Sequence, residues 1–410
     1  MKLGNAQSKL TLASVFFTFF IDNLSWAIVF PIFAPYFLGE HTALFSPSVS
    51  TSTRTLLLGF FLMAFSLGQF VGAPLLGEYA DRKGRKKALA ISTLFSLGGL
   101  ALSAWSMEVH NLWLLFLGRV VTGVFAGNMS ICIACISDLS EDEKLRGKRF
   151  GVLSLIAGVS FVVGAFLGGK LSDPTLSSLF SLSFPLWVAT VLTLVNFVFV
   201  VLGCFETSTT HEGHSFDLFE SVRKLKEAFT SKRMGHLYMV YFLFLFAWVI
   251  LFQFTPVLFV DKFDFTSSNI GDVALFMGFC WAIGSSVLNG MLLARFSTLR
   301  ILEVSLMGFT ALSTTLVFLS HVYTALAVLA GCTIIGGLAW PLCNSVISSE
   351  APREAQGKVL GMSQSIQSLA MALAPAVGGV AYQAMSGLPF LVGAGASLLA
   401  GLVYFRLKQR

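Results

Sequence analysis

The chain has 410 residues, of which 55% are hydrophobic and only 12% are charged, whereas a typical soluble protein has about 25% charged residues. With a mean hydropathy of +0.80, the chain carries more apolar surface than a water-soluble globule can bury, so we expect a polytopic membrane protein. The net charge of +6 does not indicate a nucleic-acid-binding protein, because the basic residues are distributed over alternating loops rather than over one face.

Apolar runs bounded by charged or turn residues are long enough to cross a bilayer as helices. They span 10–38, 54–77, 88–106, 111–137, 149–171, 184–204, 235–260, 270–294, 299–319, 322–348, 358–382 and 388–406. These runs predict an all-α membrane protein with twelve transmembrane helices in two pseudo-symmetric six-helix bundles, residues 1–204 and 235–410. Residues 205–234 form the predicted cytoplasmic linker, which contains an amphipathic helix.

The basic residues predict how the chain is oriented. With the N-terminus inside the cell, all but four of the 27 lysine and arginine residues lie in cytoplasmic loops, as the positive-inside rule requires. Arg54, Lys170 and Lys262 lie in outer loops, and Arg119 lies within a helix. We therefore expect a multi-pass protein of the inner (cytoplasmic) membrane with both termini in the cytoplasm.

The first apolar run contains an acid, Asp22. An ionisable side chain at the centre of a membrane helix costs about 2.5–3.5 kcal/mol even on the lower insertion scales, so it needs a partner or a watery cavity. We expect Asp22 to load and release protons or to meet a cationic substrate, and a purely structural hydrogen bond is the alternative. Asn23 and Trp26 are candidates for lining a substrate cavity, and Trp26 shares a helical face with Asp22.

The fourth run contains Arg119, the only basic residue placed well inside a predicted helix. Gly123 lies on the same face, and small residues beside a buried side chain let helices approach closely. Two roles stay open for Arg119: a structural or gating partnership with the first helix, or coupling to substrate or protons.

Amides and tryptophans in the second half are further candidates for a substrate cavity. Glutamine and asparagine in hydrocarbon should face protein or a cavity, and helix–helix hydrogen bonding is the ordinary alternative. The candidates are Trp248, Gln253, Trp340, Asn344, Gln364 and Gln367.

An internal repeat relates the two halves. At an offset of 210 residues, Gly168-Gly169 recurs as Gly378-Gly379. An even number of spans separates the copies, so the repeats are parallel, and two parallel six-helix halves are an architecture of alternating-access transporters.

The loop after the second run reads Gly77-Glu-Tyr-Ala-Asp81-Arg82-Lys-Gly84-Arg85-Lys-Lys. This segment resembles the G-x-x-x-D-R-x-G-R-[RK] loop of the major facilitator superfamily and lies between the helices where that family has it. The segments Asp22 to Pro31, Leu117 to Gly123 and Gly158 to Gly169 are similar to those of the drug:proton antiporters of this superfamily, particularly the tetracycline exporters.

The chain departs from that pattern at three places. Ala165 stands where the antiporter signature has a proline, and neither the third run nor the middle of the ninth run has the acid that the tetracycline exporters have there. Tetracycline itself is therefore not the expected substrate.

The resemblance implies a conformational latch on the cytoplasmic side. Arg85 should approach Asp138, and Asp81 should approach the start of the eleventh helix, near residues 356–361. The implied latch residues are Gly77, Asp81, Arg82, Gly84, Arg85 and Asp138. The implied helix-packing glycines are Gly123, Gly158, Gly164, Gly168, Gly169, Gly378 and Gly379.

Together these features predict a proton-coupled secondary transporter of small organic molecules, acting by alternating access as a drug or metabolite efflux antiporter. An uptake symporter for a metabolite or a siderophore-like chelator is the alternative, favoured by Ala165, and a non-transporting membrane sensor is a more remote one. The sequence has no phosphate-binding loop and no recognisable hydrolase triad, so no enzyme activity is expected. The expected partners are a small-molecule substrate, protons and the lipid bilayer, with no nucleic acid, cofactor or metal, and a monomer is expected.

Overall fold

The computed structural model describes residues 4–39, 44–46, 48–126, 128–140, 142–207, 232–350 and 356–408. All regular secondary structure in these ranges is helical. Twelve helical segments are long and apolar enough to cross a membrane, which confirms the predicted all-α class and the number of spans. The chain crosses hydrocarbon as helices because a helix satisfies its backbone hydrogen bonds internally. The amphipathic helix predicted in the linker falls within residues 208–231, outside the described residues.

The helices before the linker differ in length, from the one-and-a-half turns of α2 to the long α3. They are α1 (Asn5–Ala27), α2 (Phe33–Leu38), α3 (Thr51–Lys83), α4 (Arg85–Glu108), α5 (Leu112–Phe125), α6 (Asn128–Asp138), α7 (Glu143–Leu171) and α8 (Phe184–Gly203). The helices after the linker are α10 (Lys232–Phe263), α11 (Ser267–Ala282), the π-helix η1 (Ile283–Leu288), α12 (Asn289–Leu293), α13 (Thr298–Phe318), α14 (Val322–Ser349), α15 (Gln356–Ala384) and α16 (Leu388–Lys408).

Three of the predicted helices are interrupted. The first run divides into α1 and α2 around a turn that contains Pro31, because proline has no N–H group to continue the helical hydrogen bonding. The fourth run divides into α5 and α6, so Arg119 and Asp138 lie on different helices. The eighth run contains η1, and such π-helical insertions are frequent at functional sites.

The contacts between helices divide the chain into two compact units. Unit 1 consists of Met1–Ser46, Ala64–Leu218 and Thr266–Ala274. Unit 2 consists of Pro47–Met63, Phe219–Phe265 and Leu275–Arg410. The helices α3 and α11 therefore each contribute residues to both units.

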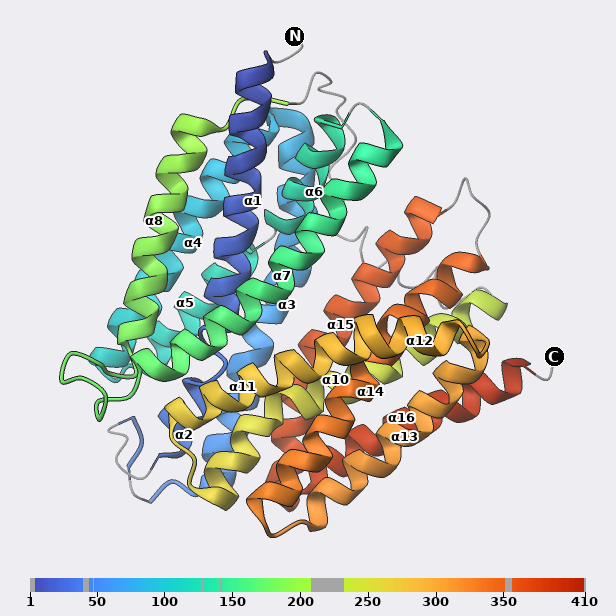
Figure 1. Cartoon of the computed structure of the whole chain (residues 1–410). Helices are drawn as coiled ribbons and strands as arrows, with labels where there is room; N and C mark the ends of the chain where they lie inside the picture. The colour runs from blue at the N-terminus through green and yellow to red at the C-terminus, as the bar shows by residue number, and fades with distance from the viewer. Residues whose placement is uncertain are drawn as a thin grey trace. The chain divides into compact units, whose positions relative to one another are not determined.

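In unit 1, α4 packs against α5 and α8, and α1 packs against α6, α7 and α8 (Figure 1). Val15, Phe19, Leu89 and Ile131 belong to a buried apolar cluster that joins α1, α4 and α6. At the start of α11, Asp272 forms an ion pair of 2.7 Å with Lys170 at the end of α7. This pair attaches the first residues of α11 to unit 1.

In unit 2, α10 packs against α14, α15 and α16, and α13 packs against α14 and α16 (Figure 1). α10 is the most deeply buried of the membrane-spanning helices. Its side chains Phe244 and Phe254 are almost completely buried, as is Phe309 of α13. Unit 2 is thus built around α10, the helix that carries Trp248 and Gln253.

Candidate functional site

Asp22 lies near the end of α1, inside the membrane-spanning segment. Its Oδ2 atom is shielded from solvent and has no hydrogen-bond partner among the described residues. Asn128, the first residue of α6, lies within hydrogen-bonding reach of the Asp22 carboxyl group. Cys132, one turn further along α6, is close enough to interact with it electrostatically. The intramembrane acid thus faces polar but uncharged groups within unit 1.

Arg119 is buried in α5 and, among the described residues, contacts aromatic rings and forms no ion pair with an acid. Its guanidinium carbon lies 5.3 Å from the ring centroid of Phe33 and 4.4 Å from that of Phe65, and the residue is only 4% exposed. Its Nε atom has no hydrogen-bond partner in the described part of the chain. Attraction between the cation and the ring faces offsets part of the cost of burying the charge. Because Phe33 belongs to α2, this contact joins Arg119 to the second half of the first apolar run.

In unit 2, the hydroxyl group of Tyr241 connects two of the predicted cavity residues. Asn344 Nδ2 donates a hydrogen bond of 3.3 Å to Tyr241 Oη, which donates one of 3.5 Å to Gln367 Oε1. Asn344 also donates to the carbonyl oxygen of Trp340 at 3.3 Å. Hydrogen bonding between α10, α14 and α15 therefore accounts for both amides. Sequence analysis missed Tyr241, although a tyrosine in a long apolar run signals a buried hydroxyl that needs a partner.

Three tryptophans form an aromatic cluster in the same unit. The ring centroids of Trp248 and Trp281 are 4.5 Å apart, and those of Trp281 and Trp340 are 5.6 Å apart with the rings nearly perpendicular. Trp248 and Trp340 were predicted cavity residues, whereas Trp281 of α11 was not singled out. Only the fold brings α11 beside α14, so the sequence carried no signal for Trp281 beyond its residue type.

The remaining predicted cavity residues are placed separately. Asn23 Nδ2 donates to the carbonyl of Phe19 one turn earlier in α1, at 2.8 Å. Trp26 packs near the ring of Phe161. Gln253 has a shielded Oε1 atom with no hydrogen-bond partner among the described residues, and Gln364 is exposed.

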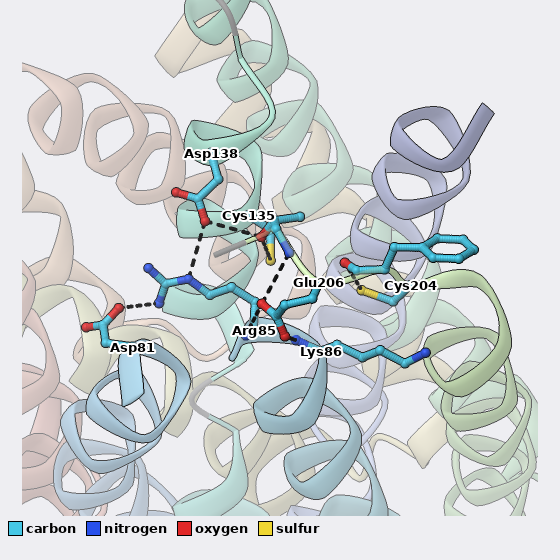
Figure 2. A network of polar contacts seen from close by, with 9 residues as sticks. Asp81, Arg85, Lys86, Cys135, Asp138, Cys204 and Glu206 are labelled. Atoms are coloured by element: carbon cyan, nitrogen blue, oxygen red, sulfur yellow. Dashed lines mark hydrogen bonds and ion pairs between the residues drawn. The ribbon is translucent and has the colours of Figure 1, made fainter. Parts of the chain in front are cut away.

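The predicted latch loop forms a network of charges at the ends of α3, α4 and α6 (Figure 2). Arg85 forms ion pairs with Asp81 at 2.6 Å and with Asp138 at 3.5 Å. Arg82 forms an ion pair of 2.5 Å with Glu78. The expected approach of Arg85 to Asp138 is present, whereas most side chains of residues 356–361 lie outside the described residues, and so does the expected contact of Asp81 with them.

Glu206 completes this network and was missed by the sequence analysis (Figure 2). It follows α8, and its carboxylate accepts hydrogen bonds from the backbone N–H groups of Arg85 and Lys86, at 2.8 and 3.2 Å. The carboxylate thus caps the N-terminus of α4, where the helix dipole favours negative charge. Gly84 makes this possible, because its φ of 99° suits glycine and a Cβ atom there would collide with Glu206. The only signal in the sequence was an acid directly after an apolar run.

Six of the predicted packing glycines lie where a Cβ atom would press against a neighbouring segment of the chain. They are Gly123 against Phe65, Gly164 against Leu24, Gly168 against Ile28, Gly169 against Ser267, Gly378 against Phe254 and Gly379 against Gly59. Gly158 lies on an exposed face of α7 with no described neighbour within 4 Å of a Cβ atom at that position, and its packing role stays a prediction.

No group of three histidine, cysteine or acidic side chains in the described ranges gathers closely enough to hold a metal ion. The six cysteines are all buried free thiols.

Comparison with known proteins agrees with this architecture. The family model of the Major Facilitator Superfamily matches residues 15–375 and 275–410. The tetracycline resistance protein, class C, of Escherichia coli is 26% identical to this chain over 344 residues, which cover 82% of this chain and 83% of that protein.

Solved structures with a similar fold are also transporters. The human organic anion transporter MFSD10 (TETRAN) superposes with a TM-score of 0.69 at 20% identity, covering 97% of this chain and 99% of that one. A D-xylose–proton symporter superposes with a TM-score of 0.74 at 16% identity, covering 98% and 97%. Since the family model spans nearly the whole chain and the twelve membrane-spanning helices fit it, the chain belongs to the Major Facilitator Superfamily of transporters.

Proposed function

We propose that this protein is a proton-coupled antiporter that exports small organic molecules. The observation that carries the proposal is Asp22, a carboxyl group inside a membrane-spanning helix with a shielded, unpartnered Oδ2 atom. An acid at that depth is costly and is by default a functional residue. The similarity to a tetracycline resistance protein supports outward transport of drug-like molecules.

In this mechanism, protonation of Asp22 and binding of substrate compete. The protein alternates between an inward-open and an outward-open state. Because each state releases one ligand and binds the other, protons are exchanged for substrate across the membrane. Coupling requires Asp22 to have a different proton affinity in the two states, because only a differential affinity can bias a conformational equilibrium.

The candidate substrate contacts in unit 2 combine apolar and polar groups. The faces of Trp248, Trp281 and Trp340 suit a flat apolar body, and the amides of Asn344 and Gln367 can exchange their hydrogen bonds with Tyr241 for bonds to a polar substrate group. In unit 1, Asn23 and Trp26 are the corresponding candidates.

We further propose that the protein lies in the inner membrane as a monomer, with both termini in the cytoplasm. The alternation of basic and non-basic loops along the sequence supports this orientation. The charge network around Arg85 would then lie on the cytoplasmic side, where the latch is expected.

Uptake by proton symport is the second candidate function. It is favoured by Ala165, which stands where the antiporter signature has proline and is buried against Ala27 and Ala274. α7 runs without interruption through this position, whereas a proline would remove a helical hydrogen bond. Transport assays in vesicles of known orientation distinguish the two directions.

Replacement of the intramembrane acid tests the proposal. The probe is the compound that raises Tm most in a screen of drugs, siderophores, sugars and amino acids against the purified protein. Asp22→Asn should fold and insert, because it removes a buried charge and keeps the shape of the side chain. In liposomes at matched protein density, this variant should lose accumulation driven by a pH gradient and retain exchange of labelled probe without a gradient.

Asp264→Asn is the matched control. Asp264 is exposed beyond the end of α10 at a φ of 53°, which asparagine also adopts readily, so the control should accumulate probe normally. Normal pH-driven accumulation by Asp22→Asn would rule out Asp22 as the coupling carboxylate.

A further inference from the structure

The surroundings of Asp22 contain a second unsatisfied polar group. Asn128 is completely buried, and its Nδ2 atom has no aligned hydrogen-bond partner among the described residues. It lies within hydrogen-bonding reach of the Asp22 carboxyl group, whose Oδ2 atom is also unpartnered. Buried polar groups in folded proteins are almost always hydrogen-bonded, so two unsatisfied atoms beside each other point to an interaction that forms in one protonation state.

The orientation of the Asn128 amide is determined by α4. The hydroxyl group of Ser92, which is also buried, shares its one proton among Asn128 Oδ1 and the carbonyl oxygens of Ala88 and Leu89 in the preceding turn of α4. An amide has its acceptor on one side and its donors on the other, so this bond leaves Nδ2 as the group available to Asp22. A donor aimed at a carboxyl group stabilises the ionised form of that group over the protonated form.

We propose that Asn128 is a positioning residue that favours the ionised form of Asp22 by donating a hydrogen bond from Nδ2, with Ser92 orienting the amide. The inference rests on the proposed role of Asp22 in proton coupling and adds what controls the proton. In the described part of the chain, α4 contributes the neutral Ser92 and α6 the thiol of Cys132, and no ion pair joins Asp22 to any element that packs on α1. Asn128 is therefore the hydrogen-bond donor in the described surroundings of Asp22 that favours release of its proton.

Infrared titration of the full-length protein in liposomes tests this inference without any substrate. The carbonyl stretch that is present in the wild type and absent from Asp22→Asn reports the protonated Asp22 carboxyl group, and its disappearance with rising pH gives a midpoint. In Asn128→Ala the midpoint should move to higher pH, with half-protonation at a proton concentration about tenfold lower, because hydrogen bonds to charged groups are worth that much or more. The pH at which proton-driven transport is half-maximal should move in the same direction.

Asn196→Ala is the matched control. Asn196 is also a completely buried amide facing α1, its Oδ1 accepts a hydrogen bond of 2.9 Å from Thr18, and its Nδ2 is likewise unpartnered. Removal of Asn196 should lower stability as much as removal of Asn128 and should leave the Asp22 midpoint unchanged. Ser92→Ala keeps the Asn128 amide but removes its hydrogen bond from the Ser92 hydroxyl group, so the midpoint should move upward by less than in Asn128→Ala. This variant serves as the test if Asn128→Ala does not fold.

The outcomes separate this inference from the proposed function. An unchanged or lowered midpoint in Asn128→Ala, with the Asp22 signal present, would overturn the role of Asn128 and leave Asp22 as the coupling carboxylate. Equal midpoint shifts in Asn128→Ala and Asn196→Ala would overturn it too, since they would reflect general loosening of the unit. Normal pH-driven accumulation by Asp22→Asn would instead overturn the proposed function itself.

Discussion

Arg119 keeps its charge in an apolar interior because two aromatic rings provide the electron-rich faces that replace water. The ring of Phe65 is the closer of the two, at 4.4 Å from the guanidinium carbon, and Phe33 lies at 5.3 Å. A planar guanidinium group suits such stacking better than the compact, strongly hydrated ammonium group of lysine. The two rings come from α2 and α3, so the pocket for Arg119 depends on three separate helices.

A double-mutant cycle measures this interaction. Arg119→Met and Phe65→Leu should be non-additive in the free energy of unfolding, with a coupling energy of about 1 kcal/mol. Reversible unfolding of the purified variants in detergent supplies the four free energies. The pair Arg119→Met and Phe60→Leu should be additive, because Phe60 is an exposed side chain of the same helix. Additivity of the Phe65 pair would mean that the ring contributes only apolar packing.

The sequence identified the two intramembrane charges but not their surroundings. Asp22 and Arg119 stand out because an ionisable residue in an apolar run is rare and costly, and that argument needs no structure. Phe33, Phe65 and Asn128 could not be selected in the same way. Phenylalanine is abundant in this chain, and a single asparagine near a helix break has no periodic pattern that indicates which residue it faces.

At the scale of helices, the start of α4 is stabilised by a residue distant in sequence. The backbone N–H groups of Arg85 and Lys86 have no partner within their own helix and donate to the Glu206 carboxylate instead. The glycine turn at Gly84 and the acids near Arg85 were predictable from the loop sequence. The cap was not, because Glu206 follows α8 and only the packing of α4 on α8 brings it to this position.

Replacement of Glu206 tests the cap. Glu206→Leu should increase hydrogen exchange at the amides of Arg85 and Lys86 and lower stability by about 1 kcal/mol, the usual value of an N-terminal cap. Glu206→Gln should have a smaller effect, because an amide oxygen can still accept one of the two hydrogen bonds. Exchange is measured by mass spectrometry on the purified protein. Glu108→Gln, at the other end of α4, should leave exchange at these two amides unchanged, and unchanged exchange in Glu206→Leu would show that the cap does not protect them.

The number of helices was predictable, and their interruptions were only partly so. Hydropathy gives the twelve spans because burial of backbone hydrogen bonds forces each apolar run into a helix. Pro31 accounts for the turn between α1 and α2. The π-helix η1 has no proline. It contains Gly284-Ser285-Ser286, which have low helix propensity, but these residues do not specify a π-helical turn rather than a kink or an ordinary turn of helix.

At the scale of the whole molecule, the proposed latch acts on the balance between conformational states. Asp81→Asn should reduce flux at least about fivefold, the effect of a coupling free energy of 1 kcal/mol or more, while binding of the screened probe stays within a few-fold of wild type. Flux in liposomes and probe binding by thermal shift are measured on the same preparations. Asp142→Asn is the control, because asparagine can make the same cap to Leu145 at the start of α7. If both flux and affinity survive Asp81→Asn, Asp81 is not part of a latch.

The exchange of segments between the two units has a consequence for biosynthesis. Unit 1 includes Thr266–Ala274, attached by Lys170 and Asp272, and unit 2 includes Pro47–Met63. The ribosome delivers Thr266–Ala274 only after α8 and α10 have been made. When α8 enters the membrane, unit 1 is therefore still incomplete, and the end of α7 near Lys170 is still uncovered. A nascent chain that stops in the linker would expose that surface to membrane quality-control proteases. Residues 1–204 made without the second half should therefore be degraded faster than the same residues co-expressed with residues 235–410, which supply the segment that covers α7.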